Sequence, residues 1–358
     1  MKFCEECFKS IEIKSLIKDD QVQGNCDFND EHTNVYTCDV HSSNNIESIK
    51  NILRQIIDVY TPNELLPKDF PHEKKDLLQN SLEKKWSLFN LDSEKIYRFL
   101  TYIFKEDIDI DKRLFEGLVG VREEIDINNE RLIVHQNQWE KFVDSITYDN
   151  RFRTNTINLN VLEKFLTYTE KNIAPKQISL FRCRISNDEQ LTKEKMSAPP
   201  RGKASAGRLN AEWISNFYLS DTSEACIQEV RAGFHDSIYI GEFKLLQEIK
   251  VADLTNFEDI TLDPTGEHLV DYYLNRQTLK KIADDFAKPT NNNYKEMNYL
   301  PLQYISDFIK SSKIGFSGIM YKSVMNNNAV NLVLFDSNLA QCVSVNKQKI
   351  KEVVYRFT

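Results

Sequence analysis

No apolar run in this sequence approaches the ~20 residues that a membrane-spanning helix requires. The opening stretch MKFCEECFKS is charged and lacks the apolar centre of a secretion signal, so we expect a cytoplasmic protein. The formal net charge of -8 disfavours sequence-independent binding to nucleic acid, because such binding relies on clustered lysine and arginine. The chain has 358 residues, of which 41% are hydrophobic, and this is enough for two or three globular domains.

The seven cysteines do not have the spacing of a disulfide framework, because they cluster early and then scatter. The early set is Cys4, Cys7, Cys26 and Cys38. The first two form one C-x2-C half of a zinc knuckle, and the third would begin the other half, where Asn29 replaces the expected cysteine. We expect the last of the four to complete a structural zinc site, with His32 and His41 as the next candidates. The alternative is a degenerate ribbon that folds without metal.

The hydrophobic pattern divides the chain into three expected domains. Residues 1–45 lack a long periodic segment and are predicted to form a small zinc-ribbon-like module. Residues 46–172 repeat apolar side chains at spacings of three and four, which predicts a mostly helical domain. A linker is expected at 171–177. Residues 176–358 alternate short β-rich segments with helices, so the predicted fold class is α+β.

Two arginines on a short apolar strand are the first candidate binding feature. Alternate residues of a strand share a face, so Arg182 and Arg184 point the same way and can bind phosphate or carboxylate. A salt-bridged surface strand is the alternative. The loop that follows ends in GRLN at 207–210 and lacks the GK[ST] ending of a phosphate loop. Its glycine and small residues would allow a ligand to approach the backbone, although a plain turn is also consistent.

A single carboxylate among small side chains is the candidate catalytic group. Glu229 shares one face of a predicted helix at 222–232 with Ala225 and Cys226, so we expect it to be partly buried. A structural pair with arginine is the alternative. Ser323 follows a predicted strand, where it can face a cleft at the sheet edge, but it can equally be a turn residue. The chain has no GxSxG motif, so a hydrolase-type nucleophilic serine is not expected.

Four segments in order resemble the RES-domain family, which is named for its arginine, glutamate and serine. The segments cover about 178–335 and read LFRCR, APP…GRLN with FYLSDTSEACIQEVR, IYIGEFKLLQEIKVADLT, and LPLQYISDFIK…GFSGIMYKSV…NLVLF. The resemblance implies an ADP-ribosyltransferase-like fold that breaks NAD+ at the nicotinamide–ribose bond. It implies a catalytic triad of Arg182, Glu229 and Ser323. Together with the strand pattern, it indicates a substrate-binding set of Tyr218, Arg208, Asn210 and Arg184.

The mechanism implied by this resemblance gives each residue a role. Arg182, with Arg208, would hold the diphosphate, and Tyr218 would pack on the nicotinamide ring. Glu229 would stabilise the positive charge that develops on the ribose, and Ser323 would orient Glu229 or the nicotinamide end. Water or phosphate would then capture the ribose. Cys183 stands where some members have an aromatic residue, so stacking on nicotinamide would fall to Tyr218 or another ring.

The family context also predicts partners. Many members are bacterial toxins paired with an antitoxin, and here the antitoxin would be a separate chain because no basic helix-turn-helix is apparent. Two alternative functions are modification of a macromolecule with ADP-ribose and a catalytically inactive binding module.

The N-terminal half looks like a HEPN/RES N-terminal domain arrangement. Three residues separate Arg131 from His135, which is one fewer than HEPN ribonucleases require. We therefore expect a scaffold, sensing or homo-oligomerisation role for this half. Asp107, Asp109 and Asp111 do not begin a calcium loop, because that loop needs glycine at its sixth position and glutamate at its twelfth.

Overall fold

The computed structural model describes residues 1–86, 88–125, 129–135, 138–257, 268–288, 295–323, 325–326 and 329–353. Two compact units form, each from two stretches of sequence. They are Met1–Leu132 with Thr261–Arg276, and Ile133–Ile260 with Gln277–Thr358. The boundaries of these units differ from those of the expected segments 1–45, 46–172 and 176–358. That these three segments are domains stays a prediction.

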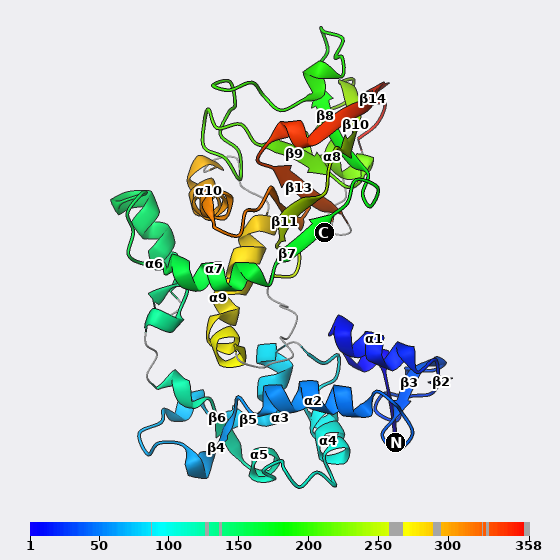
Figure 1. Cartoon of the computed structure of the whole chain (residues 1–358), viewed down its shortest axis with the longest axis vertical. Helices are drawn as coiled ribbons and strands as arrows, with labels where there is room; N and C mark the ends of the chain where they lie inside the picture. Colours follow the sequence, from blue (N-terminus) through cyan, green and yellow to red (C-terminus); the bar gives the residue numbers. More distant parts are fainter. Residues whose placement is uncertain are drawn as a thin grey trace. The chain divides into compact units, whose positions relative to one another are not determined.

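The first unit combines helices with two small antiparallel sheets (Figure 1). Its helices include α1 (Ile11–Asp19), α2 (Ile46–Ile57), α3 (Leu78–Ser81), α4 (Ser93–Ile103) and α5 (Arg113–Glu116). One sheet has the order β1-β3-β2, with bounds Lys2–Cys4, Val35–Asp39 and Gln23–Gly24. The other has the order β4-β6-β5, with bounds Thr61–Pro62, Leu118–Gly120 and Asp76–Leu77. These last strands are too short to show the alternation by which a strand is predicted.

Local sequence accounts for several of these helices. The side chain of Asp92 caps α4 by accepting a hydrogen bond from the backbone N–H of Lys95 at 2.9 Å. α3 is short and gives way to a π-helical turn at Leu82–Trp86. Phe99 of α4 lies at the centre of a buried aromatic cluster. The rings around it, with centroids 5.1–5.7 Å away, are those of Phe3, Phe8, Phe28 and Phe89.

The second unit is organised by an eight-stranded mixed sheet of order β14-β10-β8-β9-β13-β12-β11-β7. The bounds in that order are Ala340–Lys349, Ser237–Leu245, Leu180–Ile185, Phe217–Ser220, Val330–Leu334, Gly318–Lys322, Ile249–Asp253 and Glu170–Ile173. The pair β11–β12 is parallel and the other pairs are antiparallel. Its helices include α6 (Trp139–Asp144), α7 (Leu159–Thr167), α8 (Ser223–Glu229) and α10 (Lys295–Ser311), whereas α9 (Leu269–Ala287) crosses the unit boundary in sequence. The α+β class is therefore confirmed.

Both edge strands of this sheet escaped prediction. β7 occupies part of the segment expected to be a linker, and it pairs with β11. β14 pairs with β10 along its whole length. Edge strands pack on one neighbour only, so their sequences carry little apolar alternation, and the mostly polar β14 was for this reason not expected.

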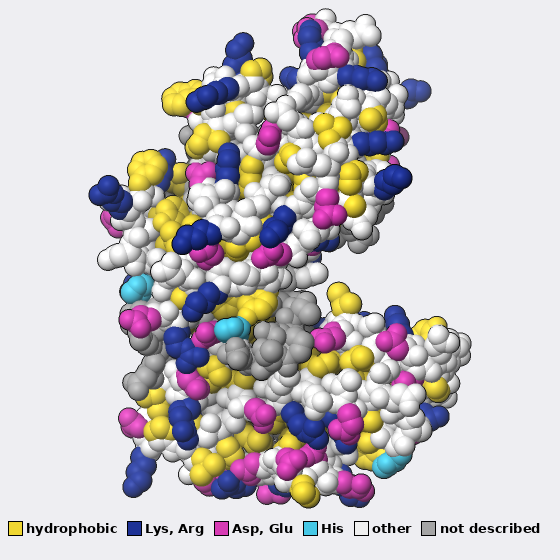
Figure 2. Space-filling view, viewed as in Figure 1, with side chains coloured by type: hydrophobic (Ala, Val, Ile, Leu, Met, Phe, Trp, Pro, Cys, Tyr) yellow, Lys and Arg dark blue, Asp and Glu magenta, His cyan; other side chains and the backbone are white. Residues whose placement is uncertain are grey.

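The two faces of the sheet carry different cores. Leu180, Phe217 and Leu332 belong to the larger apolar cluster on one face. On the other face, Cys183 of β8 packs with Cys226 of α8, and Figure 1 shows α8 beside β8, β9 and β10. In Figure 2, cationic and acidic side chains are interspersed over the visible surface. Among the described residues, no helix has the length and apolarity to cross a bilayer.

Candidate active site and metal centre

The candidate site begins at the C-terminal end of α8. This helix starts where the Thr222 side chain accepts a hydrogen bond from the backbone N–H of Ala225 at 3.2 Å, and Glu229 is its last residue. We had expected Glu229 to be partly buried, but it is exposed, because the helix ends at this residue. An exposed carboxylate is accessible to a ligand. Its use in a site then depends on the hydrogen bonds that fix its position.

Two buried side chains hold one oxygen of this carboxylate. The Ser323 hydroxyl donates to Oε1 of Glu229 at 3.0 Å, and the Asn331 amide donates to the same oxygen at 2.8 Å. Ser323 is 3% exposed and Asn331 is 4% exposed. Behind them, the Ser220 hydroxyl donates to Oδ1 of Asn331 at 2.5 Å. The structure thus brings Glu229 and Ser323 together, and it adds Asn331 and Ser220, which sequence reasoning missed.

The buried Tyr321, the half-buried Tyr218 and Arg208 belong to the same neighbourhood. Burial, more than any other cause, raises the pKa of Tyr321, and the charges of Tyr218 and Glu229 raise it further. The charge of Arg208 acts on this pKa in the opposite direction. Burial likewise raises the pKa of Tyr218, while a backbone hydrogen bond and Arg208 lower it. Arg208 is therefore the cation whose field reaches both phenols.

The GRLN turn is held together by hydrogen bonds of the Tyr218 and Asn210 side chains. The Tyr218 hydroxyl accepts from the Leu209 N–H at 3.0 Å and donates to Oδ1 of Asn210 at 2.7 Å. The Asn210 amide donates to three carbonyls of the surrounding loop, those of Ser205, Ala211 and Ile214. A Cβ at Gly207 would lie 2.5 Å from Oδ1 of Asn210, so only glycine fits there. The turn is consequently a built feature that presents Arg208, whose guanidinium donates to the Phe286 carbonyl at 2.5 Å.

The strand arginines lie on the other face of the sheet. The strand pairing places Phe181 opposite Ser220 and Ser220 opposite Asn331, so Phe181 shares their face and Arg182 points away from it. The Arg182 guanidinium donates to the Ser197 carbonyl at 2.8 Å and lies 5.3 Å from the centre of the Phe217 ring. Burial, followed by the charge of Arg184, lowers the pKa of Arg182 to about 10.

Arg184 points to the same face as Arg182 and donates to the Lys195 carbonyl. Across the described residues, no ion pair joins either strand arginine to Glu229. The structure therefore does not bring these two arginines together with the carboxylate.

A second constellation lies at the N-terminus. The ligand atoms of Cys4, Cys7, Cys26 and His32 all lie within 4.8 Å of one another. The Sγ atoms of Cys4 and Cys7 are 3.5 Å apart, those of Cys7 and Cys26 are 3.4 Å apart, and Nδ1 of His32 is 3.2 Å from Sγ of Cys4. Tetrahedral zinc with sulfur and nitrogen ligands requires separations of roughly 3.5–3.7 Å. The three shortest separations are close to these values, and the donor set is that of a zinc site.

Two details support ligation by these atoms. Nε2 of His32 lies 3.0 Å from Nδ2 of Asn29, so Nδ1 is the ring nitrogen that faces the sulfurs; ligation through Nδ1 puts the proton on Nε2, and the Asn29 amide would then turn its oxygen toward it. A hydrogen bond from Cys4 is the main cause that lowers the pKa of Cys26, and hydrogen bonding to Cys26 is the main cause that raises the pKa values of Cys4 and Cys7. Three sulfurs this close can all be thiolates only beside a cation.

His32, rather than the predicted Cys38, joins Cys4, Cys7 and Cys26 in this cluster. In the pairing of β1 with β3, Cys4 stands opposite Thr37, and Cys38 stands opposite Phe3. Neighbouring residues of a strand point to opposite faces, so the Cys38 thiol lies on the face away from Cys4. The spacing of the cysteines in the sequence does not reveal this register, so it could not distinguish Cys38 from His32.

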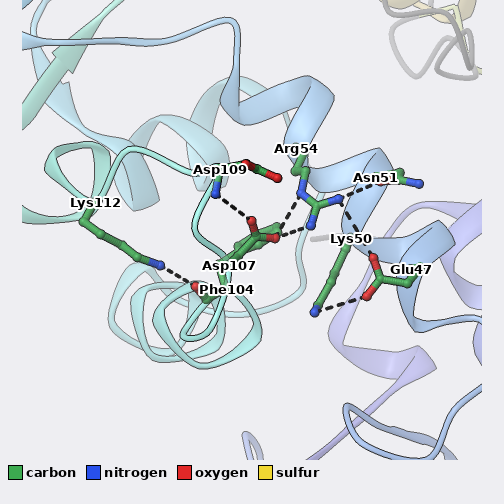
Figure 3. Close-up of polar contacts among 8 residues, drawn as sticks. All are labelled: Glu47, Lys50, Asn51, Arg54, Phe104, Asp107, Asp109 and Lys112. Atoms are coloured by element: carbon green, nitrogen blue, oxygen red, sulfur yellow. Dashed lines mark hydrogen bonds and ion pairs between the residues drawn. The ribbon is translucent and has the colours of Figure 1, made fainter.

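The acidic run after α4 is structural (Figure 3). Arg54 of α2 donates to Oδ2 of Asp107 through Nε at 3.1 Å and through a second guanidinium nitrogen, and these bonds lower the pKa of Asp107. The backbone N–H of Asp109 donates to the other oxygen at 3.2 Å. The side chain of Asp107 is only 5% exposed, whereas Asp109 is exposed to solvent.

A family model described as the RES domain matches residues 179–357, which is half of the chain. No curated protein and no solved structure matches the chain.

Proposed function

Since this chain belongs to the RES-domain family, we propose that it is an enzyme that cleaves the nicotinamide–ribose bond of NAD+. The proposal includes an ADP-ribosyltransferase-like arrangement of the eight-stranded sheet. The observation that carries it is the Glu229 carboxylate, of which one oxygen is held by two buried donors while the residue itself is exposed. A fixed, accessible carboxylate suits a reaction in which positive charge develops on a sugar.

The chemistry follows from this arrangement. The bond between C1′ of the ribose and the nicotinamide nitrogen breaks with its electron pair going to nicotinamide, which leaves an oxocarbenium-like ribose. Glu229 stabilises this charge and fixes a ribose hydroxyl, because Ser323 and Asn331 already hold its other oxygen. Preorganised groups of this kind contribute on the order of 10²–10³ in rate each. Water or phosphate then bonds to C1′ and releases a proton.

We assign the diphosphate to Arg208 in the first place. Arg208 shares a neighbourhood with Tyr218 and Tyr321, and the charge of Glu229 also acts on Tyr321. Arg182 would then act through the loop that it fixes at the Ser197 carbonyl. A guanidinium suits this task because it presents several donors to phosphate oxygens in a rigid fork.

We also propose that Cys4, Cys7, Cys26 and His32 bind one structural zinc ion. Four protein ligands close the coordination sphere, which is typical of zinc that stabilises a fold rather than zinc that activates water. Depletion of NAD+ by the second unit would be harmful to a cell, so we propose a toxin or defence effector that is restrained by a separate partner.

Product analysis tests the proposal. The purified protein is incubated with NAD+ labelled in its adenine ring, with and without phosphate, and all products are identified by mass. Free nicotinamide with ADP-ribose would identify water as the acceptor, and nicotinamide with ADP-ribose 1-phosphate would identify phosphate. Label on protein or nucleic acid would instead indicate a transferase, and unchanged NAD+ would contradict the proposal.

A further inference from the structure

Asn331 is a buried polar residue in an otherwise apolar strand. It lies in β13 (Val330–Leu334, VNLVL), opposite Ser220 of β9 and Tyr321 of β12. It is 4% exposed, although burial of an amide is unfavourable unless its polar atoms are paired. Both ends of this amide are paired, one with Ser220 and the other with Glu229.

The chemistry of these partners fixes the orientation of the amide. An ionised carboxylate only accepts hydrogen bonds, so the NH2 group of Asn331 must face Glu229. Oδ1 then faces Ser220, whose hydroxyl donates to it at 2.5 Å. A flip of the amide would place two acceptors together at Glu229. The chain Ser220–Asn331–Glu229 therefore has one favourable direction.

Ser323 and Asn331 differ in how firmly they can hold the carboxylate. The Ser323 hydroxyl also accepts a hydrogen bond from the backbone N–H of Met325 at 3.3 Å, and a hydroxyl can rotate about its bond to carbon. The backbone of Asn331 is fixed within β13, and its side-chain amide is fixed by the hydrogen bond from Ser220. Both donors bind Oε1, and across the described residues no hydrogen bond is made to Oε2 of Glu229.

We infer that Asn331 is a positioning residue for the proposed reaction: it holds Oε1 of Glu229 so that Oε2 is directed at the substrate. The inference rests on the proposed function. It predicts that loss of Asn331 slows the chemical step and leaves NAD+ binding almost unchanged, because Asn331 acts through Glu229.

The kinetic test uses Asn331→Ala and the isosteric Asn331→Asp, with Asn338→Ala as the matched control on an exposed asparagine of the same unit. We expect kcat for nicotinamide release to fall about 10- to 100-fold in both Asn331 variants, with KM within about threefold of wild type. The aspartate should not rescue activity, because it presents an acceptor where Glu229 needs a donor. Asn338→Ala should match the wild type.

Further variants keep each outcome decisive. If Asn331→Ala does not fold, Ser220→Ala takes its place and should lower kcat about three- to tenfold, because the amide loses its anchor. Wild-type kcat in folded Asn331 or Ser220 variants, beside a slow Glu229→Gln, would overturn the inference and leave the proposed function intact. If the wild type itself releases no nicotinamide, the proposed function fails. A crystal structure of Asn331→Ala then still decides, because a Glu229 side chain in its original rotamer would overturn the inference.

Discussion

The loss of zinc affinity on removal of one ligand from the N-terminal cluster can be estimated from the number of ligands. His32→Ala deletes the nitrogen that lies 3.2 Å from Sγ of Cys4. Zinc-finger peptides bind their metal with about 10–16 kcal/mol in total, which is about 2.5–4 kcal/mol for each of four ligands. At about 1.4 kcal/mol per factor of ten, the zinc affinity of this variant should fall roughly 10²- to 10³-fold.

Cys38→Ala is the matched control, because its thiol is buried on the opposite face of β3. It removes no ligand and should cost only about 1 kcal/mol of stability for the small cavity that it leaves. Zinc content is measured by elemental mass spectrometry, and affinity by competition with a chromophoric chelator. Thermal unfolding with and without chelator then reports how much the metal stabilises the fold.

The expected pattern is one zinc ion per chain in the wild type and in Cys38→Ala, with a chelator-induced fall in melting temperature in both. His32→Ala should lose its zinc at chelator concentrations that the other two proteins withstand. Equal zinc affinity in His32→Ala and wild type, or loss of zinc in Cys38→Ala alone, would refute the ligand set derived from the β1–β3 register.

Three further predictions concern stability. Tyr218→Phe removes the hydroxyl that bonds Asn210 and leaves buried groups unpaired, so denaturant titration should show a loss of about 2–4 kcal/mol. Phe99→Leu keeps an apolar side chain but loses four aromatic contacts and should cost about 2–4 kcal/mol by the same assay. Burial raises the pKa of Asp285, which accepts a hydrogen bond from Trp139 at 2.9 Å. An acid whose pKa is higher in the folded state gains stability as the pH falls through that pKa, so Asp285→Asn should melt at or above the wild-type temperature at pH 7.5, and this advantage should shrink on acidification.

Sequence patterns predicted the interior of the second unit better than its edges. The strands β8, β9 and β10 were expected because their apolar residues are dense, and buried central strands have this composition. Helix α9 was not expected, because Asn275 and Thr278 are buried within it and interrupt the apolar stripe. Local periodicity reports burial on one face, and it fails where polar side chains are buried too.

The candidate site shows the same limit. Glu229 and Ser323 were singled out from their places on a predicted helix and after a predicted strand, and the family resemblance grouped them in one site. In the structure, the end of α8 lies beside the end of β12, and the two side chains are in contact. Asn331 was missed because a lone asparagine in NLVLF has no local signal, and its importance arises from cross-strand partners. Arg182 was expected beside Glu229, but strand register decides which face a side chain takes, and a sequence pattern does not specify the register between distant strands.

The catalytic role of Glu229 is tested most directly by the rate of nicotinamide release from NAD+ by folded Glu229→Gln, measured beside wild type and Glu224→Gln. Glu224 lies on the same helix and is exposed, so its variant controls for loss of a charge. We expect release by the wild type and by Glu224→Gln, with at least a ~10²-fold lower rate for Glu229→Gln. Equal rates in all three proteins would contradict this role of Glu229.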